Sequence, residues 1–255
     1  MNLQQNSPPV PRLAVVVPVH NETGNIAPLI AEIRAALQGN ITFEIIYVDD
    51  ASTDDTPDAL NKVAADCPEL RILRHQTCSG QSAAIATGVR AARGSAIATL
   101  DGDGQNDPAD IPALLAAFDG GDNPDGLLIA GLRAKRRDSW VKRLSSRIAN
   151  GVRGRLLGDD TTDTGCGLKV FSRDAFLRLP HFNHMHRFLP ALIIRAGGKV
   201  VQVPVNHRPR ESGASKYGTL DRLAVGIVDL FGVIWLQRRG LNPDAQDVTP
   251  DRDAP

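Results

Sequence analysis

Short apolar runs alternate with segments of helical period over the first hundred residues, and this alternation constrains the fold more than any other feature. The runs are rich in β-branched residues, as in strands covered on both faces: Leu13–Val19, Phe43–Val48, Leu70–Leu73 and Ala96–Leu100. Between them the sequence predicts helices that begin with Asn25 as cap, with Thr56 as cap and Pro57 as first helical residue, and at Gln81. The pattern predicts βαβ units and an α/β fold.

The composition is that of a soluble globular protein. The chain has 255 residues, of which 42% are apolar, and its 29 Lys and Arg balance 29 Asp and Glu, so a globally basic nucleic-acid-binding protein is excluded. Its three cysteines lack metal-type spacing and favour a reducing compartment over a disulfide framework. The polar N-terminus shows no secretory signal.

Two acidic clusters follow the ends of predicted strands. Ligands of open parallel sheets bind outside the carboxyl ends of the strands. Asp also favours turns and helix caps, which is the alternative explanation for each single residue. The clusters comprise Asp49, Asp50, Asp54 and Asp55 after the second strand, and Asp101, Asp103, Asp107 and Asp110 after the fourth.

The segment Asp101-Gly102-Asp103-Gly104-Gln105 is the most specific of these features. Two carboxylates one residue apart on a glycine-containing loop are able to bind one hard cation, and Gln105 adds an amide oxygen. Mg²⁺ or Mn²⁺ prefers such ligands and commonly keeps substrate phosphates in its shell. An ordinary Asp-Gly turn is the alternative.

Basic residues and histidines gather in the second half of the chain. Nine Lys or Arg between Gly131 and Leu157 are opposed only by Asp138, which favours an anionic partner over a merely solvated face. His184, His186 and His207 are interpreted as surface or hydrogen-bonded residues rather than as a zinc site.

Four motifs appear together in the order and spacing that resemble glycosyltransferase family 2: Val16–Glu22, Val48–Asp54, Gly80–Ala84 and Asp101–Pro108. Further segments are similar to the dolichol-phosphate mannosyltransferase branch and its bacterial polyprenyl-phosphate relatives: Gly131–Arg133, Asp163–Phe171, His186–Pro190 and Arg210–Tyr217. The similarity covers roughly residues 12–236. It implies a GT-A fold, a Rossmann-like mixed sheet flanked by helices.

The resemblance also implies roles for individual residues. Asp101, Asp103 and Arg133 would be catalytic, and Asp101 and Asp103 would hold the metal with Gln105. Donor binding would involve these two aspartates and Arg133 together with Pro18, His20, Glu22, Asp50, Gly102, Arg210 and Lys216. Ala51 stands where Gly is usual, and residues 75–79 lack the usual Asn, which bears on substrate preference.

The function implied is a metal-dependent, inverting transfer of a mannose- or glucose-type hexose from a nucleotide sugar to polyprenyl or dolichyl phosphate at the cytoplasmic membrane face. A lipid phosphate is already ionised, so no general base is expected. Two alternatives stay open: a family 2 transferase acting on a saccharide or protein hydroxyl, and a non-catalytic nucleotide-sugar-binding subunit of a membrane complex.

The catalytic domain is expected over residues 12–220, followed by an amphipathic helix over 221–239 that lies at the membrane interface. Its apolar stretch, Leu223–Leu236, is about 14 residues, too short to cross a bilayer, and Arg238 and Arg239 follow it. The alternative is a core helix. Residues 1–11 and 240–255 are expected to be disordered. Peripheral attachment, or a separate transmembrane partner, would bring the enzyme to its lipid.

Overall fold

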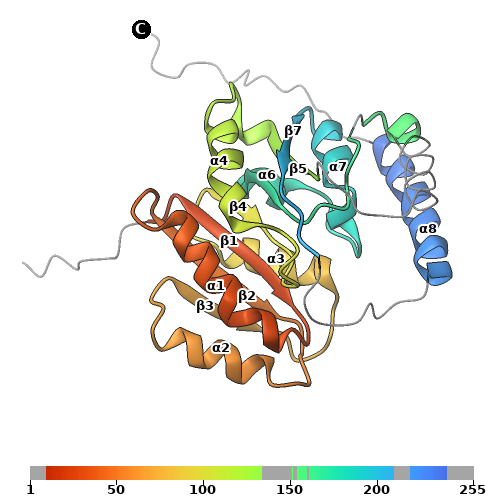
Figure 1. Cartoon of the computed structure of the whole chain (residues 1–255). Helices are drawn as coiled ribbons and strands as arrows, with labels where there is room; N and C mark the ends of the chain where they lie inside the picture. Colours follow the sequence, from red (N-terminus) through yellow and green to blue (C-terminus); the bar gives the residue numbers. More distant parts are fainter. Residues whose placement is uncertain (1–9, 134–150, 152–153, 160, 210–218, 240–255) are drawn as a thin grey trace, which may run out of the picture.

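A seven-stranded mixed sheet forms the centre of the computed structural model, which describes residues 10–133, 151, 154–159, 161–209 and 219–239 (Figure 1). The strand order is β3-β2-β1-β4-β6-β5-β7, and within it only β6 runs opposite to its neighbours. The expected mixed sheet is therefore confirmed. The strands are β1 (Leu13–Val19), β2 (Phe43–Asp49), β3 (Leu70–Arg74), β4 (Ala96–Thr99), β5 (Leu127–Arg133), β6 (Lys169–Ser172) and β7 (Lys199–Val205).

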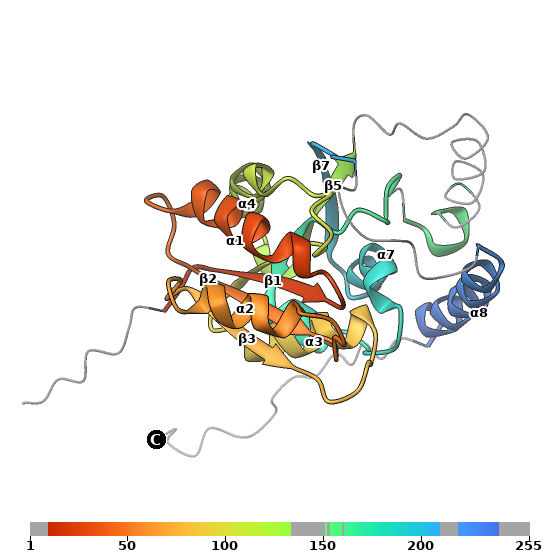
Figure 2. The same cartoon turned by 60° about the horizontal axis from the view of Figure 1, so that its bottom comes forward.

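Helices cover both faces of the sheet, because successive residues of a strand point to opposite sides. Leu13, Val15 and Val17 of β1 pack into one apolar cluster, whereas Ala14 and Val16 pack into the other. Figure 2 shows α1 and α4 on one side of the sheet. The helices are α1 (Thr23–Leu37), α2 (Thr56–Ala64), α3 (Gln81–Ala91), α4 (Ile111–Asp119), α6 (Arg173–Arg178), α7 (Leu189–Arg195) and α8 (Thr219–Gln237).

Two predicted helix starts are wrong, α1 by three residues and α2 by one. Helix α1 begins at Thr23, so Asn25 lies inside its first turn, where its amide donates to Glu22 Oε2 at 2.7 Å. Helix α2 begins at Thr56 itself, after Asp55 as N-cap. The Thr56 hydroxyl oxygen accepts from the backbone of Glu22 at 2.9 Å, so a contact between two loops replaces the expected local cap.

The predicted C-terminal helix is present as α8, which packs beside α7 (Figure 1). Val233 is fully buried, and Leu230 and Ile234 pack against the same apolar cluster. Other apolar side chains of α8 are exposed, among them Val228 at 71%, Phe231 at 67% and Trp235 at 60%. One side of the helix is thus buried against the domain, while another exposes apolar side chains. The helix is therefore not simply a core helix.

No helix within the described ranges is both long and apolar enough to cross a bilayer. Most of the basic stretch before Leu157 and the two segments expected to be disordered, except Val10 and Pro11, lie outside the described residues. Pro11 is buried shortly before β1.

Candidate active site

The loop after β4 lies against the end of β1. A Cβ atom on Gly102 would lie 2.5 Å from Val19 Cγ1 and 3.0 Å from the Pro18 carbonyl oxygen, so only glycine allows this close approach. The loop carries Asp101 and Asp103 at the carboxyl edge of the sheet. Asp103 Oδ1 accepts from the backbone of Gln105 at 3.1 Å, and Asp101 N donates to Asn106 Oδ1 at 3.1 Å.

The Asp101 carboxylate is held in an unfavourable electrostatic environment. Burial, together with the negative charge of Asp103, raises the pKa of Asp101 to about 6, although Lys169, Gln81 and Arg133 oppose the shift. Gln81, the first residue of α3, donates its Nε2 to Asp101 Oδ1 at 2.8 Å. A divalent cation would relieve the repulsion between the two carboxylates.

The oxygen atoms of this loop are therefore suitable ligands for a hard cation. Two carboxylates and the Gln105 amide oxygen would supply part of an oxygen shell, and a nucleotide diphosphate and water would complete it. The Gln105 amide nitrogen donates to the Arg208 carbonyl oxygen at 3.5 Å. Over the described ranges, His, Cys, Asp and Glu form no cluster of three or more that could hold a metal, so the carboxylate pair would need further oxygen ligands from Gln105, water or a diphosphate.

Arg133, at the end of β5, is brought close to this loop. Its guanidinium donates through Nε and Nη2 to the two carboxylate oxygens of Asp163, both at 2.6 Å, and is 16% exposed. The hydrogen bonds that Arg133 donates to Asp163 raise the pKa of Arg133, so the side chain stays charged. The predicted contact of Arg133 with a donor phosphate remains a prediction.

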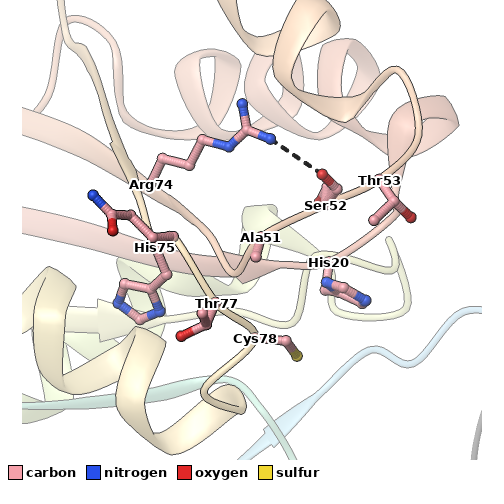
Figure 3. Close-up of a pocket in the computed structure, with 9 residues that line it drawn as sticks. His20, Ala51, Ser52, Thr53, Arg74, His75, Thr77 and Cys78 are labelled. Carbon is pink, nitrogen blue, oxygen red and sulfur yellow. Dashed lines mark hydrogen bonds between the residues drawn. The ribbon is translucent and has the colours of Figure 1, made fainter.

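A pocket of about 830 Å³ opens beside the ends of β1, β2 and β3 (Figure 3). It has the size expected of a small-molecule site. His20 lines it, as does Ala51, which adopts a left-handed φ of 58° where the resembling family usually has glycine. The other lining residues are Ser52, Thr53, Arg74, His75, Gln76, Thr77 and Cys78.

Asp50 holds the wall of this pocket rather than lining it. It is 4% exposed, and its carboxylate accepts from the backbones of Ser79 at 2.8 Å and Gly80 at 2.7 Å, and contacts His75 Nδ1 at 2.7 Å. Burial tends to raise the pKa of Asp50, but these hydrogen bonds outweigh it and lower the pKa. Gly80, which donates to Asp50, is followed directly by Gln81, which donates to Asp101. The wall of the pocket is therefore linked through adjacent residues to the loop after β4.

The remaining predicted donor residues are only partly brought together. Pro18 and His20 lie at the end of β1, where His20 Nδ1 contacts the Asp50 carbonyl oxygen at 2.8 Å. Glu22 lies at the start of α1. Arg210 and Lys216 lie outside the described residues.

Two acidic residues of the clusters have local partners, as the turn-and-cap alternative predicted: Asp54 accepts from Thr56 N at 3.0 Å and Asp107 accepts from Ala109 N at 3.1 Å. Asp110 instead accepts from Asn206 N at 2.7 Å, a contact between segments that lie far apart in the sequence. Arg208 ties Asp107 to Glu32 of α1.

Of the three histidines, His184 and His186 are hydrogen-bonded, as expected. His186 Nδ1 lies 2.7 Å from Ser82 Oγ, and His184 Nδ1 lies 2.9 Å from Asp229 Oδ2 on α8. Burial lowers the pKa of His186 to about 3, so its ring is neutral.

Three side chains of the site were not singled out from the sequence: Gln81, Asp163 and Lys169. All three lie within motifs that carry the family resemblance, which was the available signal. Lys169 is 4% exposed, and burial lowers its pKa despite nearby acidic groups. In a strand as short as the four residues of β6, periodicity does not distinguish a buried lysine from a lysine on the surface.

The carboxyl edge of the sheet thus carries a pocket of nucleotide size and, beside it, a pair of carboxylates. This combination is typical of nucleotide-sugar transferases. The sequence profile of glycosyl transferase family 2 matches residues 14–179, and the chain belongs to this family of glycosyltransferases. It is 36% identical, over 91% of its length, to the dodecaprenyl-phosphate galacturonate synthase of Rhizobium johnstonii. It is 33% identical, over 82% of its length, to the undecaprenyl-phosphate 4-deoxy-4-formamido-L-arabinose transferase of Edwardsiella ictaluri. The chain spans 69% and 63% of the lengths of these relatives.

Solved structures confirm the expected GT-A fold. A mannosyltransferase of Pyrobaculum calidifontis, solved with GDP-Man and Mn²⁺, has a TM-score of 0.65 and 23% identity over 92% of this chain and 67% of its own. Glucosyl-3-phosphoglycerate synthase of Mycobacterium tuberculosis, solved with Mn²⁺ and UDP, has a TM-score of 0.64 and 20% identity over 89% of this chain and 80% of its own.

Proposed function

We propose that the protein is a metal-dependent, inverting glycosyltransferase that moves a sugar from a nucleotide donor to polyprenyl phosphate. The observation that carries the proposal is the repelling Asp101–Asp103 pair beside the nucleotide-sized pocket. Two curated relatives are named for transferring sugars to polyprenyl phosphates, which supports this choice of acceptor.

The pocket would bind the nucleoside, and the loop after β4 would bind the diphosphate. Pro18, His20 and Glu22 would surround the base and ribose, while Asp50 would keep the wall at residues 75–80 in place. Asp101 and Asp103, with Gln105, would hold Mg²⁺ or Mn²⁺, and Arg133, Arg210 and Lys216 would contact phosphates.

Catalysis would depend on stabilising the leaving nucleoside diphosphate. A bound divalent cation would supply a Lewis acid that offsets the negative charge developing there. Arg133 contributes a fixed guanidinium in a partly dry site, where such a charge is worth more than in water. The acceptor phosphate is ionised near neutral pH, so no side chain has to remove a proton.

The sequence predicts that the transferred sugar is a mannose- or glucose-type hexose. One curated relative is named for galacturonate, a hexose derivative, and the other for 4-deoxy-4-formamido-L-arabinose, a pentose derivative, so neither gives specific support to this choice of sugar. The discriminating assay incubates the purified protein with short polyprenyl phosphate, Mg²⁺ or Mn²⁺, and UDP-galacturonate, UDP-glucose or GDP-mannose. Mass spectrometry of the lipid extract identifies the product.

We expect one donor to give a lipid-phosphate sugar and EDTA to abolish its formation. A labelled product that stays in the aqueous phase would instead favour a saccharide or protein acceptor. Donor binding without transfer to any acceptor would favour a non-catalytic subunit.

The exposed face of α8 would bring the enzyme to its lipid at the cytoplasmic membrane surface. Phe231 and Trp235 lie one helical turn apart on this face, and the exposed Arg238 and Arg239 follow. Apolar side chains beside cations are typical of helices that lie in the headgroup region. In flotation with anionic liposomes, Phe231→Asp should release the protein from the lipid fraction, whereas Asp122→Asn, an exposed change on the main domain, should not. A separate transmembrane partner would be indicated if the wild type also fails to float.

A further inference from the structure

Lys169, the first residue of β6, has no role in the steps proposed above. It is 4% exposed and pairs with Thr99 of β4 on one side and with Ala130 of β5 on the other. Strand β4 leads to Asp101, and β5 ends in Arg133. The lysine therefore lies between the strand that presents the cation-binding carboxylate and the strand that presents the arginine.

The ammonium group of Lys169 contacts the backbone of the loop that precedes β6, residues 163–168. Its Nζ donates to the backbone carbonyl oxygen of Cys166, and it lies 3.5 Å from that of Thr164. Thr99 adds a second support, since its hydroxyl donates to the Gly167 carbonyl oxygen at 2.7 Å. Buried carbonyl groups need donors, so these contacts fix the path of residues 163–168.

This loop touches both charged groups of the site. A Cβ atom on Gly167 would lie 2.3 Å from Asp101 Cγ, so the carboxylate rests directly on the loop backbone. At the other end of the loop, Asp163 holds the Arg133 guanidinium with two hydrogen bonds. A shift of the loop would therefore displace both groups together.

We propose that Lys169 is a positioning residue that fixes the loop 163–168 and thereby places Asp101 for the cation and Arg133 for the diphosphate at the same time. The proposal rests on the proposed function, because it assigns those two ligands to the site. The proposal has a specific consequence. Loss of Lys169 weakens cation binding and nucleotide binding, even when each is measured in the absence of the other.

The test compares Lys169→Met, which keeps the length of the side chain but removes its charge, with Lys169→Arg, which keeps a cationic donor. Mn²⁺ affinity is measured without nucleotide by electron paramagnetic resonance of the free ion, and UDP and GDP affinities are measured calorimetrically in EDTA. We expect Lys169→Met to weaken Mn²⁺ and nucleotide binding at least tenfold each and to raise the donor KM. Lys169→Arg should restore both affinities to within about threefold of wild type.

Two controls separate the effect of the loop from other effects. Asp163→Asn should weaken nucleotide binding but leave Mn²⁺ affinity within twofold, because the Asp163 carboxylate hydrogen-bonds to Arg133. Lys199→Met, at an exposed lysine that begins β7, should behave as wild type. If Lys169→Met does not fold, Thr99→Val tests the same loop and should weaken both affinities several-fold.

The proposal is overturned if folded Lys169→Met binds both ligands as wild type does, or if it binds Mn²⁺ more tightly. The second result would show that the lysine acts only as a repelling charge. Unchanged affinities in Thr99→Val would also overturn it. A wild-type protein that binds neither Mn²⁺ nor a nucleotide would instead contradict the proposed function itself.

Discussion

The two acidic clusters at the carboxyl edge of the sheet have similar compositions but opposite electrostatic states. After β2, donors from residues 75–80 satisfy the buried Asp50 carboxylate and lower its pKa. After β4, Asp101 is destabilised by burial and by Asp103, and its pKa is raised to about 6. Donors within the protein stabilise the charged form of Asp50, whereas the negative charge of Asp101 lacks such compensation and a bound cation would offset it.

This difference distinguishes a carboxylate that stabilises the fold, Asp50, from a carboxylate that we expect to bind a ligand, Asp101. A charge whose partners are all intramolecular adds stability, and a charge whose partners are incomplete costs stability until a ligand binds. Substitutions in the two clusters should therefore change stability and activity in opposite proportions.

The largest effect is expected from Asp103→Asn in the β4 cluster. Removing one carboxylate of the cation pair should lower kcat/KM by about 10²- to 10³-fold, the range typical for loss of a group that stabilises the transition state. The free energy of unfolding should stay constant or rise, because repulsion with Asp101 disappears. Steady-state kinetics and urea unfolding measure the two quantities.

Asp122→Asn is the matched control, since Asp122 is an exposed acid outside both acidic clusters. Activity of Asp103→Asn within tenfold of wild type would show that the β4 cluster is as structural as the β2 cluster.

The converse is expected from Asp50→Asn. This change weakens the charge-assisted hydrogen bonds from Ser79 and Gly80, so the free energy of unfolding should fall by about 2–4 kcal/mol. Activity at saturating donor should stay within tenfold of wild type below the melting transition, while the donor KM rises because the pocket wall loosens.

Asp55→Asn serves as its control from the same cluster, because the exposed Asp55 makes no side-chain cap hydrogen bond. We expect this variant to change stability by less than about 0.5 kcal/mol. Equal destabilisation by both substitutions would remove the distinction drawn for Asp50.

A pH effect of intermediate size should come from His186, which packs against Ser82 near the start of α3. Burial lowers its pKa to about 3, whereas the unfolded chain binds this proton near pH 6.5. Between these values the unfolded state binds more protons, so stability is lost as pH falls through this window. Between pH 7 and pH 5 the loss should be about 1–2 kcal/mol.

Urea unfolding of wild type and His186→Gln at both pH values isolates this effect, because the titration of other groups cancels in the difference. A difference that does not change with pH would contradict the assignment of a neutral, buried ring to His186.

The sequence predicted the first four strands, three helices and the Asp101–Gln105 loop, because periodicity and short motifs are local. It did not predict β6 between β4 and β5, because strand order depends on tertiary packing. Nor did it separate Asp50 from Asp101. The donors to Asp50 lie 25 to 30 residues further along the chain, and only the fold shows that they saturate its carboxylate.

Gln81 lies between the two acidic clusters, and its substitution should have the smallest effect on activity of the changes considered. The backbone of Gly80 donates to Asp50, and the side chain of Gln81 donates to Asp101, so consecutive residues contact both carboxylates. Gln81→Leu removes one hydrogen bond to a charged group, which is worth about 1.5 kcal/mol. Mn²⁺ affinity and kcat/KM should each fall about five- to tenfold, with no loss of thermal stability.

Gln81→Glu sharpens the same test because it adds a third negative charge beside Asp101. The metal-free variant should melt at a lower temperature than wild type, and Mn²⁺ should raise its melting temperature more than that of wild type. Gln38→Leu, at an exposed position beyond α1, controls for the loss of a glutamine. If Gln81→Leu binds Mn²⁺ within twofold of wild type, Asp101 does not depend on α3 for its position. The contact between the pocket wall and the carboxylate pair would then have no functional consequence.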